Sequence, residues 1–181
     1  MKNVLRFLAV AALLVSGVRA ADDVVSAIHG VVTKTDAATK TIVVKADDGT
    51  EHTIHFVGKT TVKGADDTAA GAKDTFHGIK EGSEVVAHYT VKGTEKTGVE
   101  IDKVGKDGMK SVDGTVTKVG KDGKTVVVKS ADGTEHTFEV AGHDTKATAK
   151  DIGTGADKTG KVTVYYTEEG GKKVAHFFKK L

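Results

Sequence analysis

The chain has 181 residues, with 27 Lys and Arg, 25 Asp and Glu, eight His, and no Cys, Pro or Trp. The absence of cysteine excludes a disulfide framework, a cysteine-ligated zinc site and a thiol nucleophile. Hydrophobic residues make up 38% and charged residues 29%, which lies in the range of folded globular proteins. The length suffices for one domain or for two small ones.

The first twenty residues have the layout of a secretory signal peptide. Lys2 and Arg6 precede an uninterrupted apolar run at 7–15, and Ala20 supplies the small residue at which cleavage is expected. The run is much shorter than the about 20 residues that a membrane-spanning helix needs. We therefore expect residues 1–20 to be removed and the mature protein to be periplasmic or secreted, with no membrane span after signal removal.

Removal of the signal peptide changes the charge of the protein. It takes away three of the 27 cations and none of the 25 anions, so 24 cations remain against 25 anions. A site for single-stranded nucleic acid needs a basic groove with aromatic side chains on which bases stack. Because the mature chain is nearly neutral and aromatic residues make up only 5%, we do not expect a nucleic-acid partner. A protein or glycan partner stays open.

Five strands are predicted in the first half of the mature chain. Alternation of apolar and polar residues marks the first, and a β-branched run marks the second. The Asp-Gly at 48–49 is typical of a hairpin turn and leads into the third. An Ala-rich segment, 66–78, separates the third strand from the last two and predicts a short helix or a loop. The predicted strands cover 28–33, 41–45, 50–57, 84–91 and 97–104.

The second half of the mature chain repeats the first. Residues 30–64 align without a gap with residues 114–148, and 17 of the 35 positions are identical. After this block the offset shortens from 84 to 77 residues, and Val85–Thr90 then matches Val162–Thr167. We therefore expect two copies joined by a linker. The predicted organisation is a signal peptide at 1–20, a first repeat at 27–104, a linker at 105–110 and a second repeat at 111–181.

Each copy has the strand pattern of a small five-stranded OB-like barrel. We predict a mainly all-β protein of two tandem barrels with a short helix or loop insert, preceded by a signal-peptide helix. Each copy is near the lower size limit for a self-supporting core, and whether the two barrels pack together stays open. In the pairs Tyr165-Tyr166 and Phe177-Phe178, alternation predicts one ring in the core and the other exposed to a partner.

Three short segments carry a resemblance to known proteins: Gly-Val-Val-Thr-Lys at 30–34, Thr-Ile-Val-Val-Lys at 41–45 and Gly-Ser-Glu-Val-Val at 82–86. They resemble small secreted bacterial OB-like β-barrel domains without an established function and, more distantly, the CusF-type periplasmic copper chaperone. This resemblance implies a five-stranded barrel. The CusF type binds Cu(I) through Met, His and a neighbouring Trp. Since this chain has no Trp and Met109 is its only methionine after the signal peptide, the resemblance implies no copper site here.

Histidines are the candidate metal ligands. A Zn, Cu or Ni ion would need three or four ligands, from histidines and nearby acids, to converge. His52 and His55 are three residues apart, which places them on opposite faces of a strand, so only the fold could bring the candidates together. The alternative is that His52 and His136 lie half-buried at a barrel mouth. The metal candidates are His52, His55, His88 and His136, and surface positions are expected for His29, His77, His143 and His176.

No catalytic or cofactor-binding residues are predicted. The serines lack a nucleophile-elbow context, and Glu51-His52-Thr-Ile-His55 lacks the leading histidine and the helix of the zinc-protease motif. We therefore expect a protein that is not an enzyme. The favoured interpretation is an exported binding or structural module of unassigned ligand. The alternatives are a periplasmic His-dependent transition-metal-binding protein and a weak polysaccharide or polyanion binder.

Overall fold

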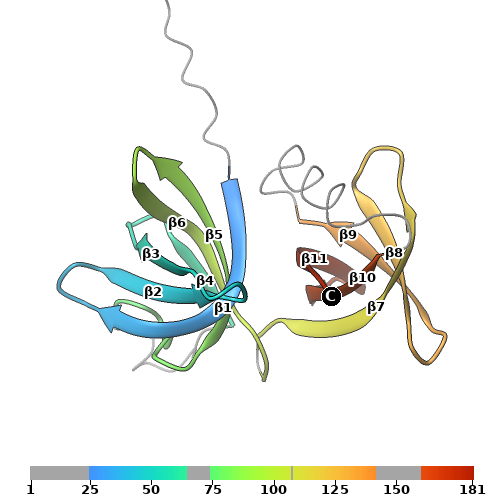
Figure 1. Ribbon diagram of the computed structural model, residues 1–181, viewed down its shortest axis with the longest axis horizontal. Coiled ribbons are helices and arrows are strands. Elements are labelled where there is room, and N and C mark those ends of the chain that lie inside the picture. Colours follow the sequence, from blue (N-terminus) through green and yellow to red (C-terminus); the bar gives the residue numbers. More distant parts are fainter. Residues whose placement is uncertain (1–24, 65–73, 107, 142–159) are drawn as a thin grey trace, which may run out of the picture.

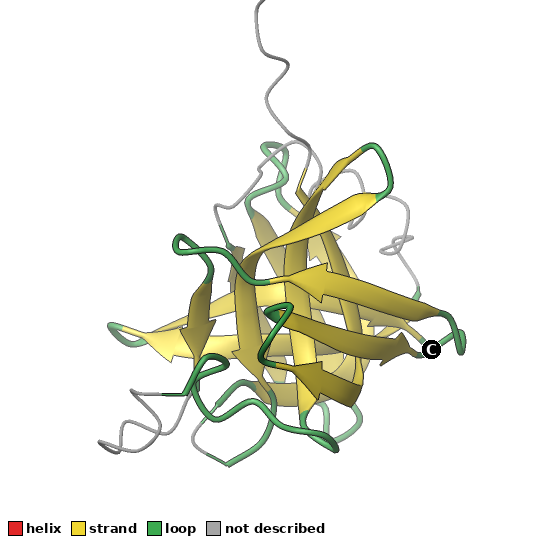
Figure 2. Ribbon diagram, turned by 90° about the vertical axis from the view of Figure 1, so that its left-hand side faces the viewer, coloured by secondary structure: helices red, strands yellow, loops and turns green. Residues whose placement is uncertain are grey.

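The computed structural model describes residues 25–64, 74–106, 108–141 and 160–181, and these residues form eleven strands and no helix. Figure 1 shows two β-barrels, one in each half of the described chain, and Figure 2 shows strands, loops and turns in the part of the chain that is described. The signal peptide and most of the predicted insert lie outside the described residues. The described end of that insert, 74–78, forms a bend and turns.

The strands follow the predicted ranges closely, with one addition. In the first barrel they are β1 (Val25–Asp36), β2 (Thr41–Ala46), β3 (Glu51–His55), β4 (Thr61–Lys63), β5 (Glu84–Lys92) and β6 (Glu95–Lys103). In the second they are β7 (Lys110–Val119), β8 (Thr125–Ser130), β9 (Glu135–Val140), β10 (Lys161–Glu169) and β11 (Lys172–Lys180). The short strand β4 was not predicted, and it pairs in parallel with β6.

Both halves have the connectivity of an OB-like barrel, as predicted. The first sheet has the order β3-β2-β1-β5-β6-β4, and an additional parallel pairing joins β3 to β6. The second is a closed barrel of order β10-β11-β9-β8-β7, in which β9 and β11 also pair in parallel. Closure of a sheet removes its exposed edges, which protects strands this rich in Val and Thr from pairing with other chains.

The repeat seen in the sequence is also a repeat of local irregularities. A register shift between Val32 and Lys34 in β1 recurs between Val116 and Lys118 in β7, at the offset of 84 residues. A shift after His88 in β5 recurs after Tyr165 in β10, at the offset of 77. The two copies therefore share their bulges as well as their strands.

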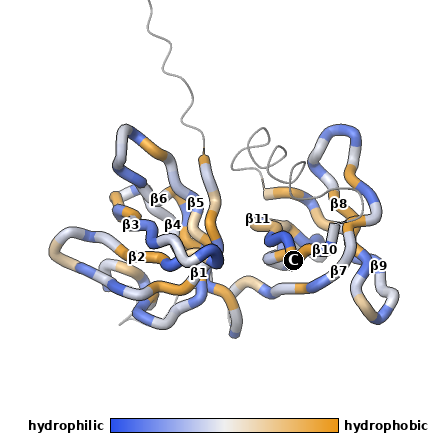
Figure 3. The backbone as a smooth tube through the Cα atoms, in the orientation of Figure 1, coloured by the Kyte–Doolittle hydropathy of each residue, from blue (hydrophilic) through white to orange (hydrophobic). Residues whose placement is uncertain are grey.

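Each barrel encloses a separate apolar core. Branched aliphatic residues alternate inward along the strands, and a few aromatic rings fill the remaining space; Figure 3 shows this alternation of hydropathy along the chain. In the second barrel Phe138 and Tyr166 contact edge to face, with ring centroids 5.2 Å apart. The first core contains Val32, Ile42, Val44, Ile54, Phe56, Phe76, Ile79, Val85, Ala87, Tyr89 and Ile101. The second contains Val116, Val126, Val128, Phe138, Val162, Val164, Tyr166 and Ala175.

The two barrels pack against each other through a third apolar cluster. Val86, Met109 and Tyr165 form its buried centre, and Val104 and Phe177 pack against them. Tyr166 and Phe178 belong to the second core, as predicted for one member of each aromatic pair. The expectation that the other members are exposed was wrong, because Tyr165 is only 5% exposed and Phe177 is half-buried where the first barrel covers them.

Candidate metal centre

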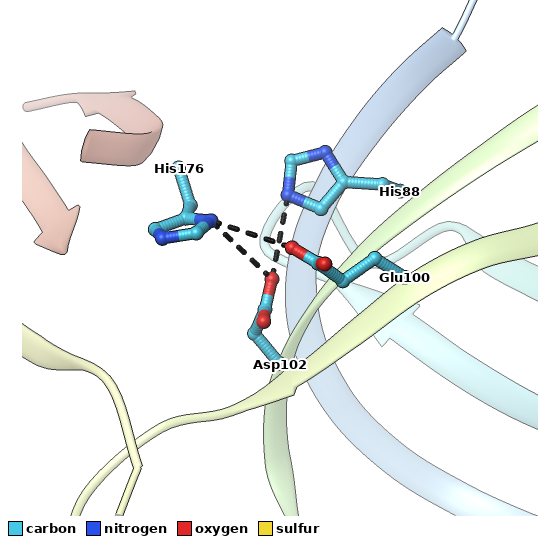
Figure 4. Close-up of side chains that lie close together, drawn as sticks. All are labelled: His88, Glu100, Asp102 and His176. Atoms are coloured by element: carbon cyan, nitrogen blue, oxygen red, sulfur yellow. Dashed lines mark ion pairs between the residues drawn. The ribbon is translucent and has the colours of Figure 1, made fainter. Parts of the chain in front are cut away.

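Four buried side chains converge where the barrels meet. His88 lies on β5, Glu100 and Asp102 lie on β6, and His176 lies on β11 of the other barrel (Figure 4). Each offers one nitrogen or carboxylate oxygen, and these four atoms lie within 4.8 Å of one another. The site is therefore shared between the two barrels, and His176 lies far along the chain from the other three residues.

Strand register explains why three of these groups meet. His88 is paired with Glu100, and Val86 is paired with Asp102, in the antiparallel β5–β6 ladder. Ile101, between the two acids, is fully buried in the first core, so alternation directs both carboxylates to the outer face of the sheet. That outer face is covered by the second barrel, so that Glu100 and Asp102 are 2% and 0% exposed.

A β-bulge delivers the fourth group. In the β10–β11 ladder Tyr165 is paired with Phe177 and Tyr166 with Ala175, so His176 is the extra residue. A bulge of this kind re-aims a side chain away from the regular alternation. His176 points toward the first barrel and is only 1% exposed.

The distances between the groups match those between ligands of a tetrahedral metal ion. His88 Nε2 lies 3.5 Å from Asp102 Oδ2. His176 Nδ1 lies 3.6 Å from Glu100 Oε1 and 3.7 Å from Asp102 Oδ2. Zn–N and Zn–O bonds of about 2.0–2.1 Å would set neighbouring ligand atoms about 3.3–3.4 Å apart in a tetrahedron. The three distances are thus too long for good hydrogen bonds but close to the edges of a four-ligand cage.

Neighbouring side chains orient two of the four groups. The Nε2 atom of His176 lies 2.9 Å from the Thr167 hydroxyl, which leaves Nδ1 directed at the acids. Lys63 Nζ lies 3.3 Å from Glu100 Oε2, which leaves Oε1 directed at His176. Metal-binding histidines and carboxylates characteristically have such outer partners.

Asp102 is the group least satisfied by the protein itself. Both its carboxylate oxygens are buried and make no hydrogen bond among the described residues, and the same holds for His176 Nδ1. A buried carboxylate without hydrogen bonds is costly, and here a second carboxylate lies beside it. A divalent cation between the four groups would compensate both negative charges.

The candidates taken from the sequence have different places in the fold. His88 belongs to the cluster, whereas His52, His55 and His136 do not. His52 is half-buried near the Tyr89 ring, and burial together with the charge of Lys96 lowers its pKa. His55 is half-buried at the other end of β3.

His136 has both ring nitrogens occupied. Its Nδ1 lies 2.8 Å from Lys173 Nζ, which can only donate, and its Nε2 lies 3.1 Å from the Ser130 hydroxyl. Ser130 in turn donates to Asp132. The hydrogen bonds from Ser130 and the Thr134 backbone lower the pKa of Asp132 to about 2. This network engages His136 in hydrogen bonds on the surface of the second barrel.

Two of the four histidines expected on the surface are buried instead. His176 is a member of the cluster, and His29 is 7% exposed. The expectation was wrong because both side chains lie between the barrels, a surface that the sequence of either copy does not reveal. His77 is exposed, as expected. His143 lies outside the described residues.

Around His29 a set of charged contacts flanks the candidate centre. Its ring nitrogens each lie 2.8 Å from a carboxylate, of Asp47 and of Glu84, and its ring stacks on Tyr165 with centroids 4.3 Å apart. Asp47 also accepts from Lys179 of the second barrel at 2.8 Å. Burial opposes ionisation of Asp47, but the hydrogen bonds from Lys179 and His29 outweigh it and lower its pKa. Burial and the nearby acids raise the pKa of Tyr165 to about 12.

Three members of the cluster were missed by the sequence analysis: Glu100, Asp102 and His176. The sequence carried one signal for the two acids. A hairpin between the fourth and fifth predicted strands places His88 beside the strand that contains Glu100 and Asp102. No comparable signal exists for His176, because the matching position of the first copy, Val99, carries no ligand.

Comparison with known proteins finds similarity at the level of structure. No protein-family model and no curated protein matches this sequence. A crystal structure of Ag(I)-bound CusF is 17% identical, with a TM-score of 0.35, over 44% of this chain and 97% of that one. Apo-CusF from Escherichia coli is also 17% identical, with a TM-score of 0.35, over 48% of this chain and 94% of that one. These proteins represent the type that the sequence resembles, and each spans the length of about one barrel.

Among the residues that the structure describes, none form a helix with the length and apolar character needed to cross a membrane.

Proposed function

We propose that this protein is an exported, non-enzymatic binding protein for a divalent transition-metal ion, held between its two barrels by His88, Glu100, Asp102 and His176. The observation that carries the proposal is the buried convergence of two imidazole nitrogens and two carboxylates within 4.8 Å. Export is supported by the signal-peptide pattern of residues 1–20.

The donor set favours particular metals. Two nitrogen and two oxygen ligands suit Zn(II), and Cu(II) and Ni(II) compete for imidazole ligands. Cu(I) and Ag(I) prefer thiolate and thioether sulfur, and the cluster contains no sulfur ligand. An all-oxygen set would suit Ca(II) or Mg(II). We therefore propose Zn(II) as the first ion to test.

The proposal of a non-enzymatic role has two supports. All four groups are buried, whereas a catalytic zinc keeps an open position for water or substrate. Among the described residues, Ser130 contacts a histidine, but it directs its proton to Asp132, so His136 does not activate it as a nucleophile.

Isothermal titration of residues 21–181, which contain every described strand, tests the proposal. After treatment with a chelator, the protein should bind one Zn(II) per chain with a Kd below micromolar. His88→Ala and Asp102→Asn should each weaken binding at least about tenfold, while His52→Ala and His136→Ala should leave it unchanged. Absence of stoichiometric binding, or equal losses in the His52 and His136 variants, would overturn the proposal.

A further inference from the structure

We infer that the bound metal ion acts as a clasp that fixes the two barrels against each other, so that metal occupancy controls the order of the whole molecule. This inference rests on the proposed function and concerns the consequence of binding. It follows from how the four ligands are divided between the barrels.

Three of the four proposed ligands lie on the first barrel and one lies on the second. His88, Glu100 and Asp102 lie on the paired strands β5 and β6, so a hydrogen-bonded ladder holds them as one unit. His176 lies on β11, and among the described residues no pairing between named strands joins the two sheets; the isolated parallel bridge Val104–Met109 lies at the linker. Coordination by all four groups is therefore possible only when the second barrel is docked on the first.

The other contacts across the interface are of modest strength. Tyr165 stacks on His29, and Lys179 pairs with Asp47. Lys63 lies 3.9 Å from Glu169, and exposed or half-exposed ion pairs contribute little to stability. The apolar cluster has only three buried members. Among the described residues these contacts favour docking without metal, whereas the two neighbouring carboxylates, Glu100 and Asp102, oppose it when both are ionised.

Metal binding and docking are then reciprocally coupled. If docking strengthens Zn(II) binding by a given factor, Zn(II) must strengthen docking by the same factor. Loss of His176 leaves a three-ligand site on the first barrel, which should still bind Zn(II), at least about tenfold more weakly, but should no longer draw the second barrel in. Removal of a docking contact outside the ligand set, such as the Tyr165 ring, should weaken Zn(II) binding as well.

Distance measurement between the barrels tests the clasp. The chain has no native cysteine, so Thr53→Cys and Thr137→Cys, both at exposed strand positions in different barrels, allow spin labels to be placed selectively. Pulsed dipolar spectroscopy of residues 21–181 should give a broad distance distribution in chelator and a narrow one with one equivalent of Zn(II), which is diamagnetic. In the His176→Ala background Zn(II) should not narrow the distribution, whereas in the control His77→Asn it should.

Tyr165→Ala provides a second test that leaves all four ligands in place. Calorimetry should show Zn(II) affinity reduced about two- to tenfold, the range expected for one aromatic stacking contact. The distribution of distances between the two spin labels should also narrow less at a given Zn(II) concentration. If calorimetry detects no Zn(II) binding in the unsubstituted protein, the proposed function fails. If Zn(II) binds but the distribution has the same width with and without it, the clasp alone is overturned. An unchanged affinity in Tyr165→Ala overturns the coupling.

Discussion

Neutralising Asp102 should make the metal-free protein more stable. The Asp102 carboxylate is fully buried and makes no hydrogen bond among the described residues; its neighbours include the imidazole nitrogens His88 Nε2 at 3.5 Å and His176 Nδ1 at 3.7 Å. His176 Nδ1 also faces Glu100, so two carboxylates share one small space. Asp102→Asn keeps the side-chain size and removes one of these charges.

The magnitude follows from the cost of an incompletely paired buried ion. Burial of an ion carries an effective penalty of several kcal/mol, and the new amide also lacks assured partners, so we expect a net gain in stability of about 1–2 kcal/mol. For a domain of 60–100 residues this corresponds to a rise in Tm of about 4–8 °C per kcal/mol. With Zn(II) at 100 times its Kd, the unsubstituted protein should gain about 2.7 kcal/mol, which the variant largely loses. The order of stabilities should therefore reverse between chelator and zinc.

Urea unfolding at pH 7, followed by circular dichroism in chelator and in excess Zn(II), measures both effects. Asp122→Asn is a matched control, because Asp122 is exposed and its turn hydrogen bond to the Lys124 backbone can be made equally by asparagine. If Asp102→Asn is instead less stable than the unsubstituted protein in chelator, the four groups stabilise the fold as an ion-pair cluster. That result would refute the reasoning that the site awaits a cation.

Three further predictions concern the barrels themselves. The neutral form of His52 is favoured in the folded state, because burial and the charge of Lys96 lower its pKa below 6.5; stability should therefore fall as the pH drops below about 6.5 toward the folded pKa, and His52→Gln should show a shallower fall in urea unfolding. Phe138→Ala, at a fully buried ring, should destabilise the second barrel by about 3–5 kcal/mol in the same assay. Gly30→Ala should cost about 1–3 kcal/mol, because its Cβ would collide with the Lys45 carbonyl.

Each of these outcomes has a clear opposite. An identical pH slope with and without His52 would show that its pKa is the same folded and unfolded. A loss below 1 kcal/mol for Phe138→Ala would place that ring outside a tightly packed core. Full stability of Gly30→Ala would mean that β1 and β2 can separate at this point without cost.

The strands could be predicted because their signals are local. Alternation, β-branched runs and Asp-Gly turns act within a few residues, and the repeat allows each copy to support the interpretation of the other. The short strand β4 carries no such signal, since Thr61–Lys63 becomes a strand only through its parallel pairing with β6. Its pairing partner lies almost forty residues away.

The site could be predicted only in part, because burial between two barrels is a tertiary property. Glu100 and Asp102 flank the apolar Ile101, which is the usual pattern of a strand with one solvated face. In the folded molecule that face is covered, so the carboxylates of Glu100 and Asp102, which the pattern places at the surface, are buried. His176 combines two features that no periodicity reveals, a bulge in β11 and a contact with the other copy.

Because the two copies share their bulges and align at defined offsets, their positions can be compared one by one. The surfaces through which the two barrels contact each other carry different residues in the two copies. His88, Glu100 and Asp102 of the first copy correspond to Tyr165, Phe177 and Lys179 of the second. Two first copies opposed through these strands would set four carboxylates together, and two second copies would oppose their lysines. Each copy is therefore better matched to the other copy than to a second copy of itself, and their linkage in one chain supplies the two in a fixed ratio of one to one.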